Sequence, residues 1–463
     1  MVEDVIVREK GAFLKGKNVL VVGLARSGIA AAKLCAAVGA NVTVNDLRGR
    51  DALEKALEDL EGIPVRCSLE NDGAEEASRQ DYLVISPGVP LTAPSVAAAK
   101  AAGVPVLGEL ELAARLCPAE YVAVTGTNGK TTTVTLLGAI FSACGKRAHV
   151  CGNVGYPMSQ TVMECGRDDA VVVEVSSFQL ETTRAFHPRA AAVLNVTEDH
   201  LNRHGTMDVY IGLKRHIFDA MDENDAAVLN GADPIVRAMG EGLRAKKLLF
   251  SSRQEEAEGV FVRDGHMIVR TGGAETDICP IDEIRIPGTH NLENAMAASA
   301  IAIARGVDAS VIRETLRTFE GVEHRIEFVR EKDGVRYIND SKGTNCDSTE
   351  KAIDAMKAPT ALILGGYDKH VSFDRLAEKI AKDEHIRVCV LIGATADQIE
   401  ASLRKAGYPS ILRAESLEEA VRLCEKNAKP GWNALLSPAC ASFDMFSDYE
   451  ERGRVFKRIV RAL

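Results

Sequence analysis

The sequence predicts an α/β protein of three domains, each with a mostly parallel sheet. The chain has 463 residues, enough for about three domains of ordinary size. Short apolar runs of strand length alternate with longer helical patterns, as they do in βαβ units. Several runs end in loops rich in Gly, Ser, Asn or Asp, which usually line ligand sites at the carboxyl ends of parallel strands. We place the domains at residues 1–107, 108–320 and 321–463.

The first domain opens with a strand–turn–helix–strand unit of the Rossmann-like type, NVLVVGLARSGIAAAKLCAAVGANVTVND at residues 18–46. Its turn keeps Gly23 and Gly28 but has Ala25 between them, so the dinucleotide fingerprint is incomplete. The unit therefore allows three interpretations: a site for NAD, a site for another nucleotide-like ligand, or a simple strand cap. A second buried strand, DYLVISPGVP at residues 81–90, ends in another turn.

A phosphate-binding loop marks the start of the second domain, in the segment YVAVTGTNGKTTTVT. Gly126 and Gly129 let the backbone approach an anion, and the N–H groups of the following helix attract negative charge. Lys130 can reach the outer phosphates, and the Thr131 hydroxyl can bind Mg²⁺. The loop lacks the first glycine of the strict G-x-x-x-x-G-K-[ST] pattern. We expect ATP here; the alternative is a Gly-rich turn before a core helix.

Three further side chains of this domain attract attention. Glu174 lies in an apolar strand predicted over residues 170–181, where an unpaired carboxylate is costly to bury. It either shares Mg²⁺ with Thr131 or pairs with a basic side chain. His200, in NVTEDHLNRHG, is a metal ligand, a substrate contact or an ordinary loop histidine. Lys214, beside another basic residue, has by itself the pattern of a surface lysine.

The rest of the second domain is predicted to be β-rich over residues 226–286, followed by a helix over residues 290–305. Asn291 and Asn294 lie at the start of this helix, where their amides either cap it or contact a nucleotide base. Arg325 follows at the junction with the third domain. Its guanidinium either grips a phosphate or forms an ordinary ion pair.

The third domain again alternates strands and helices and is predicted to be Rossmann-like. Its apolar runs are TALILGG, VCVLIGA and NALLSPA. Two polar stretches, YINDSKGTN and LLSPACASFDMFSDYE, follow predicted strands. Lys342 and Ser442 in these stretches can hold the carboxylates of an acidic substrate, with Lys369 nearby; the alternative is a pair of solvated loops.

Composition narrows the class of partner. The net charge is −10 and no long basic run is present, so we expect small anionic ligands and no nucleic acid. The 11 cysteines include no C-x-x-C pair, which predicts reduced thiols and no zinc site. The apolar runs are too short to span a membrane, and the first residues lack a signal-peptide core, so we expect a cytoplasmic protein.

Taken in order, the motifs resemble those of the Mur ligases, ATP-dependent amide-forming enzymes of peptidoglycan synthesis. The resemblance covers nearly the whole chain: SPGVP, TGTNGKTT, GNVGYP, EVSSFQLE, NVTEDHLNRHG, GTHNLEN, EHRIEFV, NDSKGTN and LLSPACASFDMF. It implies a central P-loop-type ATPase domain between Rossmann-like N- and C-terminal domains. NDSKGTN with SPACASFD, and no D-N-P-x-R motif, implies addition of D-glutamate to UDP-N-acetylmuramoyl-L-alanine through an acyl phosphate and a tetrahedral intermediate.

The resemblance also implies roles for particular residues. ATP would contact Gly126, Thr127, Asn128, Gly129, Lys130, Thr131, Thr132, Asn291, Asn294, Arg325 and Asp340. The uridine diphosphate substrate would contact Arg26, Ser27, Asp46, Arg48, Gly88, Asn153 and His200. D-glutamate would contact Lys342, Thr344, Lys369, Ser442, Phe443 and Tyr449, the last standing where a family ligase has Phe.

Catalysis is implied at Lys130, Glu174, His200 and Lys214. Two Mg²⁺ ions would be bound by Thr131, Glu174, His200 and Lys214, the lysine as a carbamate formed with CO₂. Three rival hypotheses remain: a folylpolyglutamate synthase-like ligase, an NAD-dependent oxidoreductase built on the first strand–turn–helix unit, and a catalytically silent nucleotide-binding module. We expect a monomer without membrane insertion.

Overall fold

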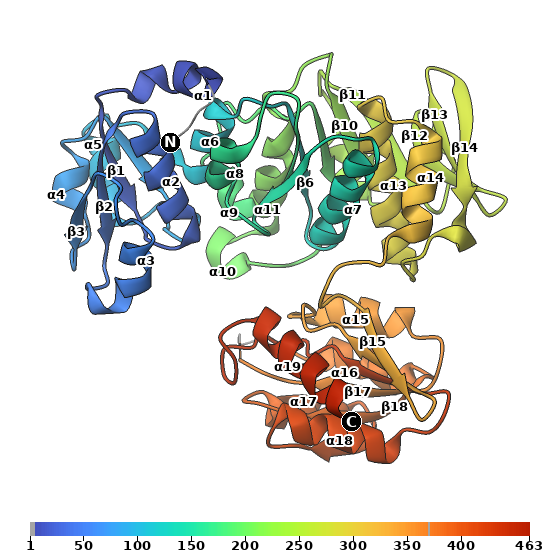
Figure 1. Cartoon of the computed structure of the whole chain (residues 1–463). Coiled ribbons are helices and arrows are strands. Elements are labelled where there is room, and N and C mark those ends of the chain that lie inside the picture. The colour runs from blue at the N-terminus through green and yellow to red at the C-terminus, as the bar shows by residue number, and fades with distance from the viewer. Residues whose placement is uncertain (1–4, 369–370) are drawn as a thin grey trace. The chain divides into compact units, whose positions relative to one another are not determined.

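The computed structural model describes residues 5–368 and 371–463, the side chain of Asn202 excepted, and shows three sheets flanked by helices (Figure 1). This agrees with the predicted α/β class. The sheets lie in two compact units. Unit 1 comprises the residues up to Ile284 together with Leu292–Phe319, and unit 2 comprises Arg285–Asn291 together with Glu320–Leu463. Unit 1 contains the first two sheets, and the predicted boundary between their domains stays a prediction.

The first sheet has five parallel strands in the order β3-β2-β1-β4-β5, as in a doubly wound fold. Its strands are β1 (Asn18–Val22), β2 (Asn41–Asp46), β3 (Val65–Leu69), β4 (Tyr82–Ile85) and β5 (Val106–Gly108). Its helices are α1 (Val5–Lys10), α2 (Arg26–Ala37), α3 (Glu54–Glu58), α4 (Ala74–Ala77), α5 (Pro94–Ala101) and α6 (Glu109–Leu116).

The second sheet has nine strands in the order β14-β13-β12-β11-β10-β9-β6-β8-β7, parallel from β7 to β12 and antiparallel at β13 and β14. The strands are β6 (Tyr121–Thr125), β7 (Ala148–Gly152), β8 (Ala170–Glu174), β9 (Ala190–Val193), β10 (Ala226–Asn230), β11 (Lys246–Ser251), β12 (Gly259–Arg263), β13 (His266–Thr271) and β14 (Ala274–Pro280). The helices are α7 (Lys130–Ala143), α8 (Met158–Glu164), α9 (Ser177–Leu180), α10 (Leu201–His204), α11 (Met207–Arg215), α12 (Pro234–Ala238), α13 (Thr289–Ala304) and α14 (Ala309–Thr318).

The third sheet belongs to unit 2 and has the order β15-β16-β20-β17-β18-β19, parallel except for the β15–β16 pair. Its strands are β15 (Glu327–Lys332), β16 (Val335–Asn339), β17 (Thr360–Leu364), β18 (Ile386–Leu391), β19 (Ile411–Arg413) and β20 (Asn433–Leu436). Its helices are α15 (Cys346–Ala355), α16 (Asp374–Lys382), α17 (Ala396–Lys405), α18 (Leu417–Asn427) and α19 (Tyr449–Ala462).

One predicted element is shorter than expected. The strand predicted over residues 170–181 ends at Glu174, and helix α9 follows. The cause is a capping box, in which Ser176 Oγ accepts a hydrogen bond from Gln179 N–H and Gln179 Oε1 accepts one from Ser176 N–H. The turn moves the chain out of the sheet directly after Glu174.

A continuous apolar core joins the first two sheets. It includes Val19 and Leu34 from the first sheet and its helices, and Met158, Val162 and Phe186 from the second. The inner parallel strands β6, β8 and β9 are buried along their whole length, as expected for strands covered on both faces. The carboxyl ends of the strands are left as the edge where polar loops gather.

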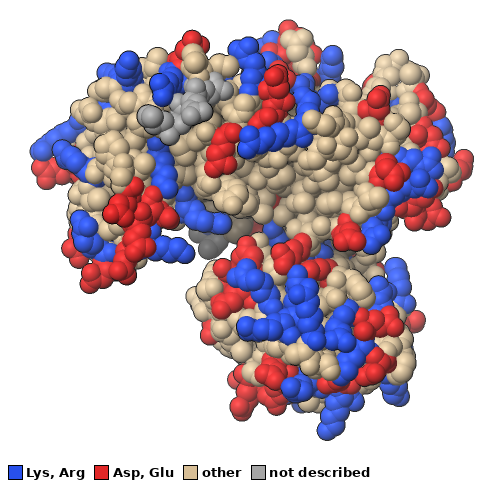
Figure 2. Space-filling view, viewed as in Figure 1, with Lys and Arg blue, Asp and Glu red and all other residues tan. Residues whose placement is uncertain are grey.

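Charge is spread over the surface. Figure 2 shows acidic and basic side chains intermingled over most of the visible face, with a denser basic group over α19 that includes Arg454, Lys457, Arg458 and Arg461. Among the described residues no helix is long and apolar enough to cross a bilayer.

Candidate active site

The phosphate loop connects β6 to α7, as predicted. Gly126 and Gly129 have φ angles of 153° and 88°, which favour glycine. A Cβ on Gly129 would lie 2.2 Å from Asn294 Oδ1, so the loop packs directly against α13. Lys130 Nζ donates to the carbonyl oxygens of Gly126 and Thr127, both at 2.8 Å. The lysine is thus folded over the loop that precedes α7.

The back of this loop is held by the segment that follows β9, the strand next to β6. Asn195 Oδ1 accepts from the Asn128 N–H at 2.8 Å, and Asn195 Nδ2 donates to the Asn128 carbonyl at 3.0 Å. Thr127 Oγ1 accepts from Thr197 N–H at 3.0 Å. Thr132 Oγ1 is buried and has no hydrogen-bond partner in the described part of the chain. The loop is therefore preorganised before any nucleotide is bound.

Thr131 and Glu174, the two residues predicted to share a metal, lie in contact. Thr131 Oγ1 donates to Glu174 Oε2 at 2.7 Å, and Asn153 Nδ2 donates to Glu174 Oε1 at 2.8 Å. Glu174 is 2% exposed at the end of β8. A hydroxyl and a carboxylate beside a phosphate loop form a hard oxygen donor set, which fits Mg²⁺.

His200 lies on the loop after β9, at the N-terminus of the short α10. Its φ is 54°, and its ring meets the Phe178 ring edge-on at a centroid distance of 4.8 Å. Its Nε2 lies 3.5 Å from Asp199 Oδ2. Nearly half of the side chain is exposed, so an imidazole nitrogen is accessible to a ligand.

Lys214 is not a surface lysine, although its sequence neighbours suggest one. It is 1% exposed on α11, and its Nζ lies 4.4 Å from the centroid of the Tyr210 ring. Burial and the positive charge of Lys130 hold the pKa of Lys214 well below its usual value, against an opposing effect of Asp199. The amine is therefore neutral over a wider pH range than an exposed lysine, and a neutral amine is a nucleophile.

Sequence reasoning missed the aromatic stack that holds Lys214 in place. The ring of His204, the last residue of α10, stacks on the ring of Tyr210 in α11 at a centroid distance of 5.5 Å. The Tyr210 hydroxyl lies 3.3 Å from Thr127 Oγ1 in the phosphate loop. His204 Nε2 lies 3.0 Å from Ser177 Oγ. The only signal in the sequence was the spacing of Tyr210 and Lys214, four residues apart on one helix face.

Asp46, the last residue of β2, and Arg48, two residues later, form an ion pair. Both are predicted to contact the uridine substrate. Arg48 donates to the Asp46 carboxylate through Nε and Nη2, both at 2.9 Å, and Leu24 N–H donates to it at 2.8 Å. Burial alone would raise the pKa of Asp46, but these hydrogen bonds and the charge of Arg48 lower it to about 2. Arg26, the first residue of α2, and Gly88, on the loop after β4, are both exposed.

The turn after β1 and the first turn of α2 are in close main-chain contact. A Cβ on Gly28 would lie 1.9 Å from the Gly23 carbonyl oxygen, and Ser86 Oγ donates to that oxygen at 2.6 Å. Gly28 is thus required by close packing of turn against helix. Ser27, the second residue of α2, is half-buried. The glycines of the incomplete fingerprint therefore have a structural role whatever ligand binds.

In unit 2, Asp340 is buried at the end of β16. It accepts hydrogen bonds from Ser437 Oγ at 2.7 Å and from Ile326 N–H at 3.2 Å. Burial raises its pKa to about 6, opposed by the nearby charge of Arg325. Arg325 Nε is buried without a hydrogen-bond partner among the described residues. Asn291, which also belongs to unit 2, donates from Nδ2 to the Pro287 carbonyl at 2.7 Å.

The residues predicted to surround D-glutamate lie on loops of unit 2. Lys342 Nζ lies 5.2 Å from the centre of the Tyr449 ring, and Thr344 is half-buried in the same loop as Lys342. Ser442 is 2% exposed, whereas Phe443 is 65% exposed. Lys369 lies outside the described residues. Five of the six predicted side chains thus occupy two loops and the start of α19.

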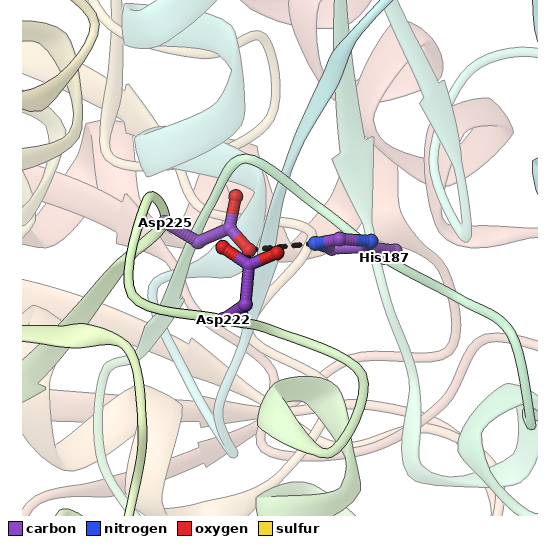
Figure 3. Close-up of side chains that lie close together, drawn as sticks. All are labelled: His187, Asp222 and Asp225. Atoms are coloured by element: carbon purple, nitrogen blue, oxygen red, sulfur yellow. Dashed lines mark hydrogen bonds and ion pairs between the residues drawn. The ribbon is translucent and has the colours of Figure 1, made fainter.

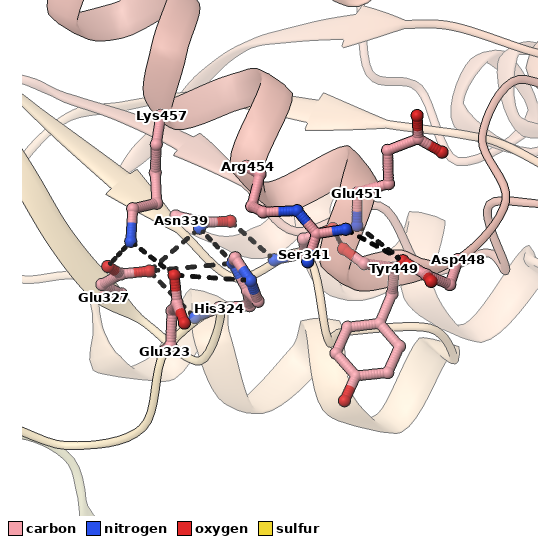
Figure 4. A network of polar contacts seen from close by, with 10 residues as sticks. All are labelled: Glu323, His324, Glu327, Asn339, Ser341, Asp448, Tyr449, Glu451, Arg454 and Lys457. Atoms are coloured by element: carbon pink, nitrogen blue, oxygen red, sulfur yellow. Dashed lines mark hydrogen bonds and ion pairs between the residues drawn. The ribbon is translucent and has the colours of Figure 1, made fainter. Parts of the chain in front are cut away.

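A polar network of ten residues also holds α19, the helix that begins at Tyr449 (Figure 4). Lys457 Nζ pairs with Glu323 at 2.8 Å and with Glu327 at 2.5 Å. Asn339 Nδ2 lies 2.9 Å from His324 Nδ1. The Tyr449 ring points away from this network, so the network anchors the helix without using the predicted substrate contact.

A second cluster, in unit 1, consists of His187, Asp222 and Asp225 (Figure 3). Asp225 Oδ2 is 2.6 Å from His187 Nε2 and accepts from Asp222 N–H at 2.8 Å, and Asp225 Oδ1 pairs with Arg189 at 3.4 Å. These partners occupy the buried carboxylate of Asp225. We interpret the cluster as an ion-pair network that fixes the turn before β10.

Comparison with known proteins bears on identity. Three family models match the chain: the Mur ligase MurD-like N-terminal domain at residues 17–108, the Mur ligase middle domain at 124–302 and the Mur ligase glutamate ligase domain at 324–440. A UDP-N-acetylmuramoylalanine–D-glutamate ligase of Caldanaerobacter subterraneus is 44% identical over 452 residues, 97% of this chain and 99% of the relative. One of Pelotomaculum thermopropionicum is 46% identical over 447 residues, 96% of this chain and 98% of the relative. The chain belongs to the Mur ligase family.

Solved Mur ligases confirm the predicted fold class. MurC of Thermotoga maritima matches with a TM-score of 0.61 at 19% identity, over 96% of this chain and 99% of that one. MurF of the same organism, solved with ADP, matches with a TM-score of 0.60 at 14% identity, over 99% of each chain. These similarities concern the fold alone.

Proposed function

We propose that this Mur ligase uses ATP to join D-glutamate to UDP-N-acetylmuramoyl-L-alanine, yielding UDP-N-acetylmuramoyl-L-alanyl-D-glutamate, ADP and phosphate for peptidoglycan synthesis. The observation that carries the proposal is the 44–46% identity, over nearly the full chain, to relatives with this activity in their names. Residues 1–107 would bind the uridine substrate, 108–320 ATP and 321–463 D-glutamate. We further propose that the enzyme acts as a monomer in the cytoplasm.

The first chemical step joins two negatively charged groups. An oxygen of the L-alanine carboxylate attacks the γ-phosphorus of ATP, the bond to the β-phosphate oxygen breaks, and ADP leaves. Lys130 and the N–H groups at the start of α7 lower the repulsion between these groups. Mg²⁺ bound at Thr131 and Glu174, with a second ion at His200, would neutralise further charge on the phosphates.

We propose that Lys214 acts as a carbamate. Its neutral amine attacks the carbon of CO₂, a C–N bond forms as one C=O π bond opens, and one proton is released to solvent, which converts a neutral amine into an anionic oxygen ligand. Burial of the amine and its lowered pKa support this step. An unmodified ammonium so close to Lys130 would repel metal ions as well as being costly to bury.

The second step consumes the acyl phosphate. The D-glutamate nitrogen attacks the carbonyl carbon, a tetrahedral intermediate forms, phosphate leaves, and the nitrogen loses a proton to give the amide. Lys342 and Ser442 would hold the two carboxylates of the amino acid, while Asp46 and Arg48 would help to hold the uridine substrate.

The test is release of phosphate from ATP and Mg²⁺ in the presence of UDP-N-acetylmuramoyl-L-alanine, with D-glutamate, L-glutamate, L-lysine, meso-diaminopimelate or no amine. Release that depends on D-glutamate alone is expected. Release with another amine would keep the ligase mechanism and change the acceptor. Absence of release with every amine would refute the proposed function.

A further inference from the structure

The guanidinium of Arg452, on α19, lies at the meeting point of polar loops from unit 2. Its Nη2 donates to the Ser341 carbonyl at 2.8 Å and its Nε to Ser341 Oγ at 3.0 Å. On the other side, Nη1 donates to the Ala441 carbonyl at 3.2 Å and Nη2 to the Cys440 carbonyl at 3.1 Å. One side chain therefore connects the loop of Lys342 to the loop of Ser442.

A third loop packs against the same group. It begins after β17, and Tyr367 N–H donates to the Ala441 carbonyl at 2.9 Å. A Cβ added to Gly366 would lie 3.2 Å from Arg452 Nη1 and 2.3 Å from the Ala441 oxygen. Because β16, β20 and β17 are neighbours in the sheet, their three carboxyl-end loops converge on Arg452.

The charged guanidinium of Arg452 is costly to bury. Arg452 is 1% exposed, and within the described residues it forms no ion pair with a carboxylate at 4 Å or less. Its charge is balanced mainly by carbonyl dipoles, with Asp340 and Asp444 farther away. The planar guanidinium carries donors on three nitrogens, so it can bond carbonyls on two sides at once, whereas the donors of a lysine all lie on one nitrogen.

We propose that Arg452 is a positioning residue that holds these three loops in the arrangement that receives the acidic amino acid. This inference rests on the proposed function, because it assigns the loops to that substrate. Arg452 acts through Ser341 and through the peptide of Ala441, which directly precede Lys342 and Ser442. Ser341 Oγ also donates to the Tyr449 carbonyl at 2.8 Å, so the first turn of α19 is held by the same set of bonds.

The test compares Arg452→Met and Arg452→Lys with Arg454→Met, a matched control on the same helix whose side chain is 60% exposed. KM for D-glutamate is expected to rise about tenfold or more in Arg452→Met, whereas KM for ATP and for the uridine substrate stays within about twofold. Arg452→Lys keeps the charge but loses the fork, and it should show most of the same rise. Arg454→Met should resemble the wild type.

Ser341→Ala is a milder variant for the case in which Arg452→Met does not fold. It removes one acceptor and the link to Tyr449, and it should raise KM for D-glutamate a few-fold. Unchanged KM for D-glutamate in folded variants, or an equal rise for all three substrates, would overturn the inference. If the wild type uses another amine, the comparison is made with that amine.

Hydrogen exchange provides a readout that needs no substrate. In Arg452→Met, and not in Arg454→Met, exchange should accelerate in the loops at residues 340–345 and 438–442. Equal exchange in both variants would refute the positioning role even if the wild type proved to have no ligase activity, so failure of the inference and failure of the proposed function are separable.

Discussion

Replacing Lys214 by methionine should abolish ligation and at the same time stabilise the protein at neutral pH. Lys214 is 1% exposed, with Tyr210 on one side and Lys130 close enough to repel its ammonium form. Methionine fills a similar volume and carries no charge. The variant therefore removes the proposed carbamate and also removes a group that is costly to bury when protonated.

The pH dependence follows from the direction of the shift. The usual pKa of a lysine is 10.5, and that of Lys214 in the folded protein is lower. Above pH 10.5 the amine is neutral in both states and costs nothing. As the pH falls below this value, the unfolded chain takes up a proton that the folded chain does not. The wild type should therefore lose about 1.36 kcal/mol of stability per pH unit relative to Lys214→Met, until the folded amine itself is protonated.

The measurement is urea unfolding of the wild type, Lys214→Met and a control, Lys146→Met, which replaces an exposed lysine between α7 and β7. The free-energy difference between wild type and variant is followed between about pH 8 and 10 in CO₂-free buffer. Bicarbonate should then stabilise the wild type and Lys146→Met, which both keep Lys214. It should leave Lys214→Met unchanged, because that variant has lost the lysine proposed to form the carbamate. Parallel pH curves for the wild type and Lys214→Met would refute the burial argument.

Three further predictions concern the other predicted contacts. Glu174→Gln should lower kcat for phosphate release by about 10²-fold or more and raise the Mg²⁺ concentration needed, as followed by a metal titration; an unaltered titration would remove Glu174 from the metal site. Gly129→Ala should raise the Kd for ATP about tenfold or more, since its φ of 88° and the Asn294 oxygen at 2.2 Å oppose a Cβ; calorimetry that shows wild-type affinity would contradict this. Asp46→Asn should raise KM for the uridine substrate about tenfold and leave that for ATP unchanged, because it releases Arg48; equal effects on both would argue against a substrate-specific role.

The parts of the site that could be predicted from the sequence are those encoded locally. The phosphate loop was legible because Gly126, Gly129, Lys130 and Thr131 are neighbours in the chain and their spacing has a physical meaning. Glu174 was singled out by the cost of burying a carboxylate in an apolar strand, but its position at the carboxyl end of β8 was not predicted. The fold class was predictable because alternating strands and helices specify parallel sheets.

What sequence reasoning lacked was burial produced by distant segments. Lys214 is followed by Arg215, and its four-residue spacing from Tyr210 does not show that both side chains are buried. Arg452 likewise stands among several basic residues of α19. Its only local signal is phase, because Phe456 and Val460 lie four and eight residues later on the buried face.

The two buried cations differ in a way that separates their roles. Lys214 lies against an aromatic ring and beside another lysine, so the environment favours its neutral form and leaves a nitrogen that can form a bond. Arg452 is surrounded by carbonyl oxygens, and although burial lowers its pKa to about 10, it stays protonated at neutral pH with its donors engaged. The first environment suits a chemical step and the second a fixed scaffold. Removing Lys214 should therefore lower turnover with all substrates saturating, whereas removing Arg452 should weaken capture of a single substrate.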